Sequence, residues 1–124
     1  MVRIFRLKEA PVSDLPLGRG KLFTLTDEKS GARNVGVMVV ETKPGSKPGQ
    51  YHYHNKRETV YIVLRGRARA LIDGKEYLFT PGTVAYVAPG EKHRTVNVGK
   101  TPFRMIEIYS PLEPDRVDVA EEKS

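Results

Sequence analysis

The sequence has no cysteine and no tryptophan among its 124 residues, and it has only three histidines. The absence of cysteine excludes disulfide frameworks, thiolate zinc sites, iron–sulfur clusters and cysteine nucleophiles. A transition-metal site in this chain would therefore have to use the three imidazoles together with carboxylates. No run approaches the ~18 consecutive apolar residues that cross a bilayer, so we expect no membrane partner.

The chain is also poor in amide side chains, with three asparagines and a single glutamine. Few amides, no cysteine and many charged residues are typical of thermostable proteins, and we expect thermostability here. The apolar start is interrupted by arginine and lysine, unlike a signal peptide, so a cytoplasmic location is expected. The length predicts one domain.

Positive charge is in excess, with 21 Lys and Arg against 15 Asp and Glu, a net charge of +6. Arg65, Arg67 and Arg69 alternate with small residues, which places three guanidinium groups on one face of a strand. We interpret this face as the solvated outside of a sheet, where charge guards against edge pairing. No RNA-binding motif accompanies it, so nucleic acid is not an expected partner.

Glycines divide the second half of the chain at nearly regular steps of eight or nine residues, from Gly66 to Gly99. Short strand-like runs lie between them, and Asp73-Gly74 is a strong two-residue hairpin signal. This spacing predicts an all-β sandwich or barrel with little helix. The expected strands are residues 3–7, 22–26, 34–42, 51–54, 59–64, 68–72, 76–79, 83–87, 93–98 and 103–109. We expect an irregular connection over 8–20 and, from residue 112, a polar tail that forms a short helix or frays.

The three histidines have a spacing that favours metal binding. His52 and His54 stand two residues apart in a strand-like segment, so both imidazoles point to the same face. Glu58 follows four residues later, and His93 begins a later strand. Three neutral imidazoles with an optional carboxylate suit one divalent transition metal ion, namely Fe, Mn, Ni, Co, Cu or Zn.

Two motifs formed around these histidines resemble those of the cupin family. The first comprises Pro44-Gly45, His52, His54, Glu58 and Gly66, and the second comprises Gly82, Pro89-Gly90, His93 and Asn97. Every histidine of the chain falls on a metal-ligand position of this pattern. The resemblance implies a single small β-barrel, a double-stranded β-helix or jelly roll, with the metal inside near one mouth.

The resemblance leaves the fourth ligand open between two neighbouring residues. Counted forward from His54, Glu58 has the family's spacing, but counted back from Gly66 the same position is Thr59. A shift of one residue in a strand reverses the direction of a side chain. We favour Glu58, because a carboxylate matches a buried cation better than a hydroxyl does. With Thr59 inward, the site would be three histidines and water.

The resemblance also implies a domain organisation and an assembly. We assign residues 35–110 to the barrel core, 1–34 to N-terminal strands and an irregular connection of the same domain, and 111–124 to a polar C-terminal tail. Small single-barrel cupins are often dimers, so a homodimer is expected. The strand at residues 3–7 could add to the sheet edge of the partner copy.

The fold hosts several activities, so function has to be argued from the site. The main hypothesis is a metal-dependent enzyme that acts on a small polar molecule, either as a dioxygenase or as a sugar isomerase. The alternatives are a non-catalytic small-molecule binding or sensor module, and a structural barrel with an adventitious metal. Whether the chain is an enzyme stays open at this point. The candidate pocket residues are Tyr53, Thr59, Tyr61, Tyr86, Arg104 and Glu107.

Overall fold

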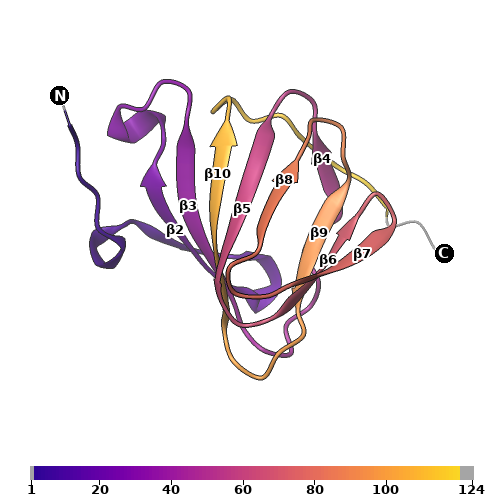
Figure 1. Ribbon diagram of the computed structural model, residues 1–124. Coiled ribbons are helices and arrows are strands. Elements are labelled where there is room, and N and C mark those ends of the chain that lie inside the picture. Colours follow the sequence, from indigo (N-terminus) through magenta and orange to yellow (C-terminus); the bar gives the residue numbers. More distant parts are fainter. Residues whose placement is uncertain (1, 121–124) are drawn as a thin grey trace.

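A computed structural model of the chain, which describes residues 2–120, shows two antiparallel sheets that face each other (Figure 1). The first sheet has the order β1 (Val12–Asp14), β2 (Gly20–Thr26), β3 (Gly36–Thr42), β10 (Phe103–Ser110), β5 (Glu58–Arg65) and β8 (Val84–Val87). The second has the order β11 (Arg116–Asp118), β4 (His52–His54), β9 (His93–Asn97), β6 (Ala68–Ile72) and β7 (Lys75–Phe79). The predicted all-β, jelly-roll architecture is confirmed.

Helical structure in residues 2–120 is limited to three short 3-10 turns, η1 (Leu7–Glu9), η2 (Pro16–Gly18) and η3 (Glu28–Ser30). None of the described helices has the length and apolar character needed to cross a membrane.

The core lies between the sheets because strand residues alternate between inside and outside. In β5, Thr59, Tyr61 and Val63 are buried, whereas Glu58 is exposed. The inward residues of both sheets form one apolar cluster, which consists of Val40, Tyr61, Val63, Ala68, Ala70, Phe79, Val87, Phe103 and Met105. Burial of this cluster supplies the main driving force for folding.

Two of the predicted glycine turns show why glycine is required there. Asp73 and Gly74 have φ angles of 47° and 80°, which are the two positive values of a tight hairpin turn, and they connect β6 to β7 as predicted. Gly66 has a φ of 82°, and a Cβ atom there would lie 2.5 Å from the carbonyl oxygen of Pro102. The chain passes too closely at this point for any side chain.

The two ends of the chain differ from the sequence-based expectation. Residues 3–7 form no strand, and the N-terminal strand of the first sheet is Val12–Asp14, which pairs with β2. The tail, expected to be helical or frayed, instead contributes β11, which pairs with β4. Both differences have one cause. A segment forms a strand only where the edge strand of a sheet is available to pair with it, and the local sequence pattern does not show where such an edge lies. The end of the tail, 121–124, lies outside the described residues.

Candidate metal centre

The three histidines converge from two neighbouring strands of the second sheet. His52 and His54 lie on β4, and His52 is directly opposite His93 of β9. The ring centroid of His52 is 4.3 Å from that of His93 and 5.2 Å from that of His54. One ligand atom of each ring lies within 4.8 Å of the others, which is close enough for a single ion to bridge all three.

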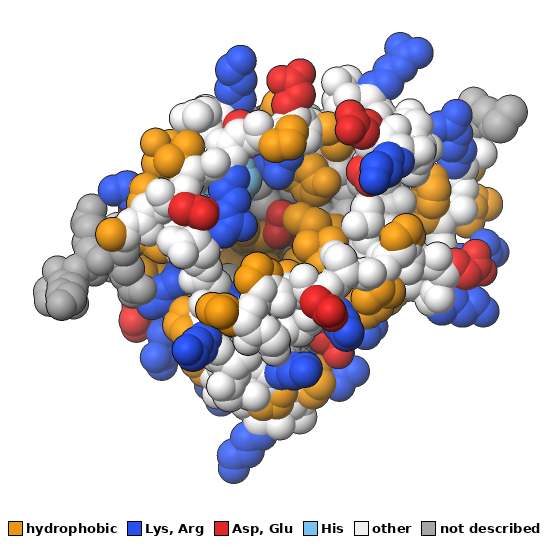
Figure 2. Space-filling model, turned by 180° about the vertical axis from the view of Figure 1, so that it is seen from behind, with side chains coloured by type: hydrophobic (Ala, Val, Ile, Leu, Met, Phe, Trp, Pro, Cys, Tyr) orange, Lys and Arg blue, Asp and Glu red, His pale blue; other side chains and the backbone are white. Residues whose placement is uncertain are grey.

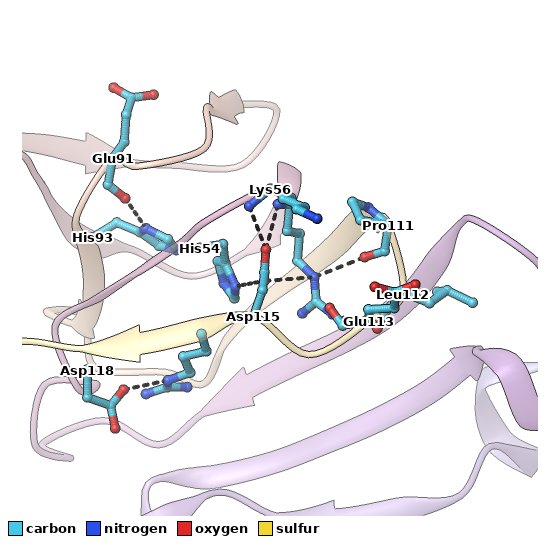
Figure 3. A network of polar contacts seen from close by, with 11 residues as sticks. His54, Lys56, Glu91, His93, Pro111, Leu112, Glu113, Asp115 and Asp118 are labelled. Carbon is cyan, nitrogen blue, oxygen red and sulfur yellow. Dashed lines mark hydrogen bonds and ion pairs between the residues drawn. The ribbon is translucent and has the colours of Figure 1, made fainter.

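Each imidazole is held by a hydrogen-bonding partner at its Nδ1 atom. The Nδ1 of His52 is 2.7 Å from the carbonyl oxygen of Gln50, and that of His93 is 2.8 Å from the carbonyl oxygen of Glu91. The Nδ1 of His54 is 2.9 Å from Oδ1 of Asp115 (Figure 3). A carbonyl or carboxylate acceptor favours the tautomer that carries its proton on Nδ1. Nε2 is then the nitrogen with a free lone pair.

The Nε2 atom of His93 is buried and has no hydrogen-bonding partner. A buried polar atom without a partner costs free energy, so its retention needs a reason. A cation coordinated by Nε2 is such a reason, because it replaces the missing partner. The donor set, the orientation imposed at Nδ1 and this orphaned atom together fit a divalent transition metal.

All three histidines are also kept neutral, as metal ligands must be. Burial lowers the pKa of His52 to about 3, and repulsion from His93 adds to the effect. Burial likewise lowers the pKa of His54, against the opposing effect of the hydrogen bond that Asp115 accepts from it. The pKa of His93 is lowered for the same reason. The imidazoles therefore offer lone pairs at neutral pH without first losing protons.

The favoured fourth ligand, Glu58, does not lie with the histidines. Glu58 is exposed, and its Oε1 accepts a 2.6 Å hydrogen bond from the hydroxyl of Tyr86 on the outer face of the first sheet. Its neighbour Thr59 is the buried residue, with 2% of its surface exposed. The reason is the alternation of β5, which is fixed by the inward packing of Tyr61 and Val63. The spacing counted back from Gly66 thus describes the direction of these side chains correctly.

The histidines line a cavity of about 440 Å³ between the sheets. Figure 2 looks into a hollow of the surface in which histidine, acidic and basic side chains are visible at depth. Glu107 of β10 also lines the cavity, opposite Tyr61 of β5 in the sheet. Burial raises the pKa of Glu107 to about 7, so near neutrality this carboxyl group exists in both protonation states. The lining further includes Arg19, Arg57, Arg94, Asp115 and Arg116.

The strand face on which each of the other predicted pocket residues lies decides whether it lines the cavity. Tyr61 and Glu107 line the cavity, and Thr59 shares the inward face of β5. Tyr53 does not line it, because it lies between His52 and His54 on β4 and so points the other way. Tyr86 is 56% exposed. Arg104 does not line the cavity either; its Nε donates to Glu41 at 2.9 Å, across the paired strands β10 and β3.

Four charged residues of the cavity were not predicted from the sequence, namely Arg19, Arg57, Asp115 and Arg116. Arg19 follows an irregular turn and Arg116 belongs to the unexpected strand β11. No periodic pattern or motif marks them. Only Arg57 had a usable signal, since it lies three residues after His54 in the loop that leads to β5.

The profile of the Cupin_2 family, described as "Cupin domain", matches residues 38–109. The chain is 37% identical over 95 residues to a glucose-6-phosphate isomerase of Pyrococcus furiosus and 34% identical over 95 residues to that of Thermococcus litoralis. Each match covers 67% of this chain and 49% of the relative. The chain thus spans about half the length of these relatives.

Solved structures share the fold at much lower sequence identity. The polyketide cyclase RemF from Streptomyces resistomycificus superposes with a TM-score of 0.82 at 19% identity, over 99% of this chain and 89% of that one. KdgF from Halomonas sp. superposes with a TM-score of 0.78 at 16% identity, over 90% of this chain and 94% of that one. At such identities the likeness supports the fold alone.

Proposed function

The chain belongs to the cupin family, and on that premise we propose that it is a metal-dependent isomerase of small anionic sugars. One observation carries the proposal: three neutral histidines and a carboxyl group of near-neutral pKa line the same cavity. The histidines fit a metal ion, and the carboxyl group fits the transfer of a proton. An aldose–ketose isomerisation needs both functions.

His52, His54 and His93 would hold the metal through their Nε2 atoms. When bound, a divalent ion supplies a Lewis acid that polarises a carbonyl or hydroxyl oxygen of the substrate. With three protein ligands, such an ion would have positions left for oxygen atoms of the substrate.

Glu107 is the proposed acid–base group. With a pKa of about 7, its carboxylate takes a proton from the carbon beside the substrate carbonyl, and its protonated form returns that proton to the neighbouring carbon. The isomerisation balances when one proton also moves from the neighbouring hydroxyl oxygen of the substrate to its carbonyl oxygen. Tyr61, buried on the adjacent strand, lines the cavity beside Glu107.

The charge of the cavity favours an anionic substrate. Four arginines and two carboxyl groups line it, the arginines being Arg19, Arg57, Arg94 and Arg116. Guanidinium groups bind phosphate and carboxylate oxygens in a bidentate manner. The relatives named glucose-6-phosphate isomerase support a phosphorylated sugar as the first substrate to test.

The test is interconversion of glucose 6-phosphate and fructose 6-phosphate by protein loaded separately with Fe²⁺, Mn²⁺, Ni²⁺, Co²⁺, Cu²⁺ or Zn²⁺. We expect one equivalent of bound metal and turnover with at least one ion. The double variant His52→Ala/His54→Ala should lose both, whereas Tyr53→Phe, altered between them on the opposite face, should retain both. Stoichiometric metal in the double variant would refute the site.

The same preparations separate the alternative functions. Oxygen uptake by the iron-loaded protein with a catechol or flavonol would identify a dioxygenase instead. Tight binding of a sugar phosphate without turnover by any metal form would identify a binding module. Neither outcome affects the metal site itself.

We further propose a thermostable homodimer located in the cytoplasm. The segment before β1 exposes Val2 and Ile4 at 84% and 72%, a large apolar exposure for an extended arm. An arm of this kind can cover the surface of a partner copy. Light scattering on the full chain and on a chain without residues 1–10 measures the oligomeric state of each. A dimer that is unchanged in the shortened chain would exclude a role for the arm.

A further inference from the structure

The segment that follows β10, residues 111–118, lies across the histidine site and is called the strap here. Its residue Asp115 contacts two parts of the molecule at once. Oδ1 of Asp115 is 2.9 Å from Nδ1 of His54, and Oδ2 accepts hydrogen bonds from the backbone amides of Lys56 and Arg57 at 2.7 and 2.9 Å (Figure 3). Both carboxylate oxygens are therefore used, and one of them orients an imidazole of the site.

Arg57 fixes the strap from the opposite direction. Its Nε donates to the carbonyl oxygen of Pro111 at 3.2 Å, and its Nη2 donates to those of Leu112 and Glu113 at 2.8 and 3.2 Å. The guanidinium also lies 4.1 Å from the centre of the Tyr109 ring. Three carbonyl groups that would otherwise need water are satisfied by one side chain. The turn after β4 and the strap thus form one hydrogen-bonded unit with His54 at its centre.

Backbone pairing continues this contact beyond Asp115. The amide of Asn55 donates to the carbonyl oxygen of Asp115 at 3.4 Å, and the amide of Val119 donates to that of Tyr51 at 3.0 Å. Between them β11 pairs with β4, the strand that carries His52 and His54. All of these contacts come from residues beyond 109, the last residue of the family match.

We propose that the strap is part of the metal centre, with Asp115 as a positioning residue for His54, so that metal binding and closure of the strap stabilise each other. The inference rests on the metal site of the proposed function. It follows because the acceptor at Nδ1 fixes the ring orientation of His54, and a cation at Nε2 makes the Nδ1 proton a stronger donor to Asp115. Coupling between two such events is reciprocal by thermodynamic necessity.

The first measurement is the Zn²⁺ affinity of wild type, Asp115→Asn and Glu113→Gln, by competition with a chromophoric chelator. Asn keeps an acceptor for the backbone amides but removes the charge facing His54. We expect the Kd of Asp115→Asn to rise about 10-fold or more, as is typical for the partner of a ligating histidine. Glu113→Gln is the matched control, since it makes the same change on an exposed residue of the strap, and its Kd should stay within about twofold.

The second measurement needs no variant and so does not depend on one that folds. Amide hydrogen exchange is followed in wild type with and without Zn²⁺, at Asn55 and Val119, which report the strap, and at Gly82, which donates to the carbonyl oxygen of Val63 away from it. We expect Zn²⁺ to slow exchange about 10-fold or more at Asn55 and Val119, and less at Gly82. In Asp115→Asn this difference should largely disappear, a loss that a purely structural role for Asp115 would not produce.

The outcomes separate the inference from the proposed function. Zn²⁺ binding with equal Kd values for Asp115→Asn and Glu113→Gln would overturn the inference and leave the metal site standing. Bound Zn²⁺ that slows all three amides equally, or none of them, would overturn the coupling. A wild-type protein that takes up no Zn²⁺ would refute both.

Discussion

The interior of this protein has two ends of opposite character, and the same two strands cross both. On β5 and β10, Val63 and Phe103 belong to the apolar cluster and do not line the cavity. Two residues further along each strand, Tyr61 and Met105 belong to the cluster and also line the cavity that contains the histidines, and Glu107 follows Met105 on the inward face of β10. The change from hydrocarbon to ionisable side chains therefore takes place within one step of the inward face.

The difference shows that one end of a small barrel stabilises the fold, whereas the other end holds the candidate site. The apolar end stabilises the fold by removing hydrocarbon from water and by close packing. The cavity end holds buried imidazoles and a carboxyl group whose charged forms are disfavoured by burial, as the pKa shifts of His52 and Glu107 show. Such groups reduce stability unless a ligand binds them. The apolar end offsets that cost.

The largest expected effect is at the apolar end, from Phe103→Ala. Phe103 is 1% exposed, so its truncation leaves a cavity in the packed cluster. We expect a loss of about 3–5 kcal/mol in the free energy of unfolding, measured by urea denaturation. The folded fraction should still bind one equivalent of Zn²⁺. A loss below about 1 kcal/mol would show that this end does not carry the stability.

At the cavity end, Glu107→Gln should raise the free energy of unfolding. The size of this gain should depend on pH. Because the folded pKa of about 7 exceeds the ordinary 4.5, the native state holds a proton that the unfolded state has released between these values. The wild-type carboxyl group therefore stabilises the fold progressively less as the pH rises through this window. For the metal-free protein we expect the variant to gain on the order of 2 kcal/mol over wild type at pH 8, and little at pH 4.5.

Urea denaturation of both metal-free proteins across this pH range measures the difference. A gain that is the same at pH 4.5 and pH 8 would contradict the raised pKa. In the metal-loaded protein, the same variant should lose isomerase activity if Glu107 transfers the proton.

The smallest effect is expected from Glu58→Gln, on the outside of β5. Glu58 accepts a hydrogen bond from Tyr86 at the surface, where water competes for both groups, so the free energy of unfolding should change little. The Zn²⁺ stoichiometry should remain one and the Kd should stay within about twofold, by the competition assay. A tenfold rise in Kd would contradict this and would indicate that the carboxylate of Glu58 is a metal ligand, as the motif spacing favoured.

Much of the fold was predictable because it depends on local chemistry. The turn at Asp73-Gly74 and the strands around it follow from residues that tolerate positive φ and from alternating side chains. The convergence of His52 and His54 follows from the same alternation, and the motif pattern placed His93 with them. The direction of Glu58 was predicted wrongly, since a carboxylate was preferred on chemical grounds over a threonine that the strand places inside.

The sequence by itself determined the alternation of the strands, the positions of the turns and the three imidazoles available as ligands, because each depends on residues adjacent in the chain. Only the tertiary structure decided that the tail forms β11, that Asp115 orients His54 across 61 residues, and that Arg19 and Arg116 reach the cavity. The contacts of β11 and Asp115 join distant segments at the edge of β4. An edge exists only after the sheets have formed, so no local pattern in the sequence encodes what will cover it.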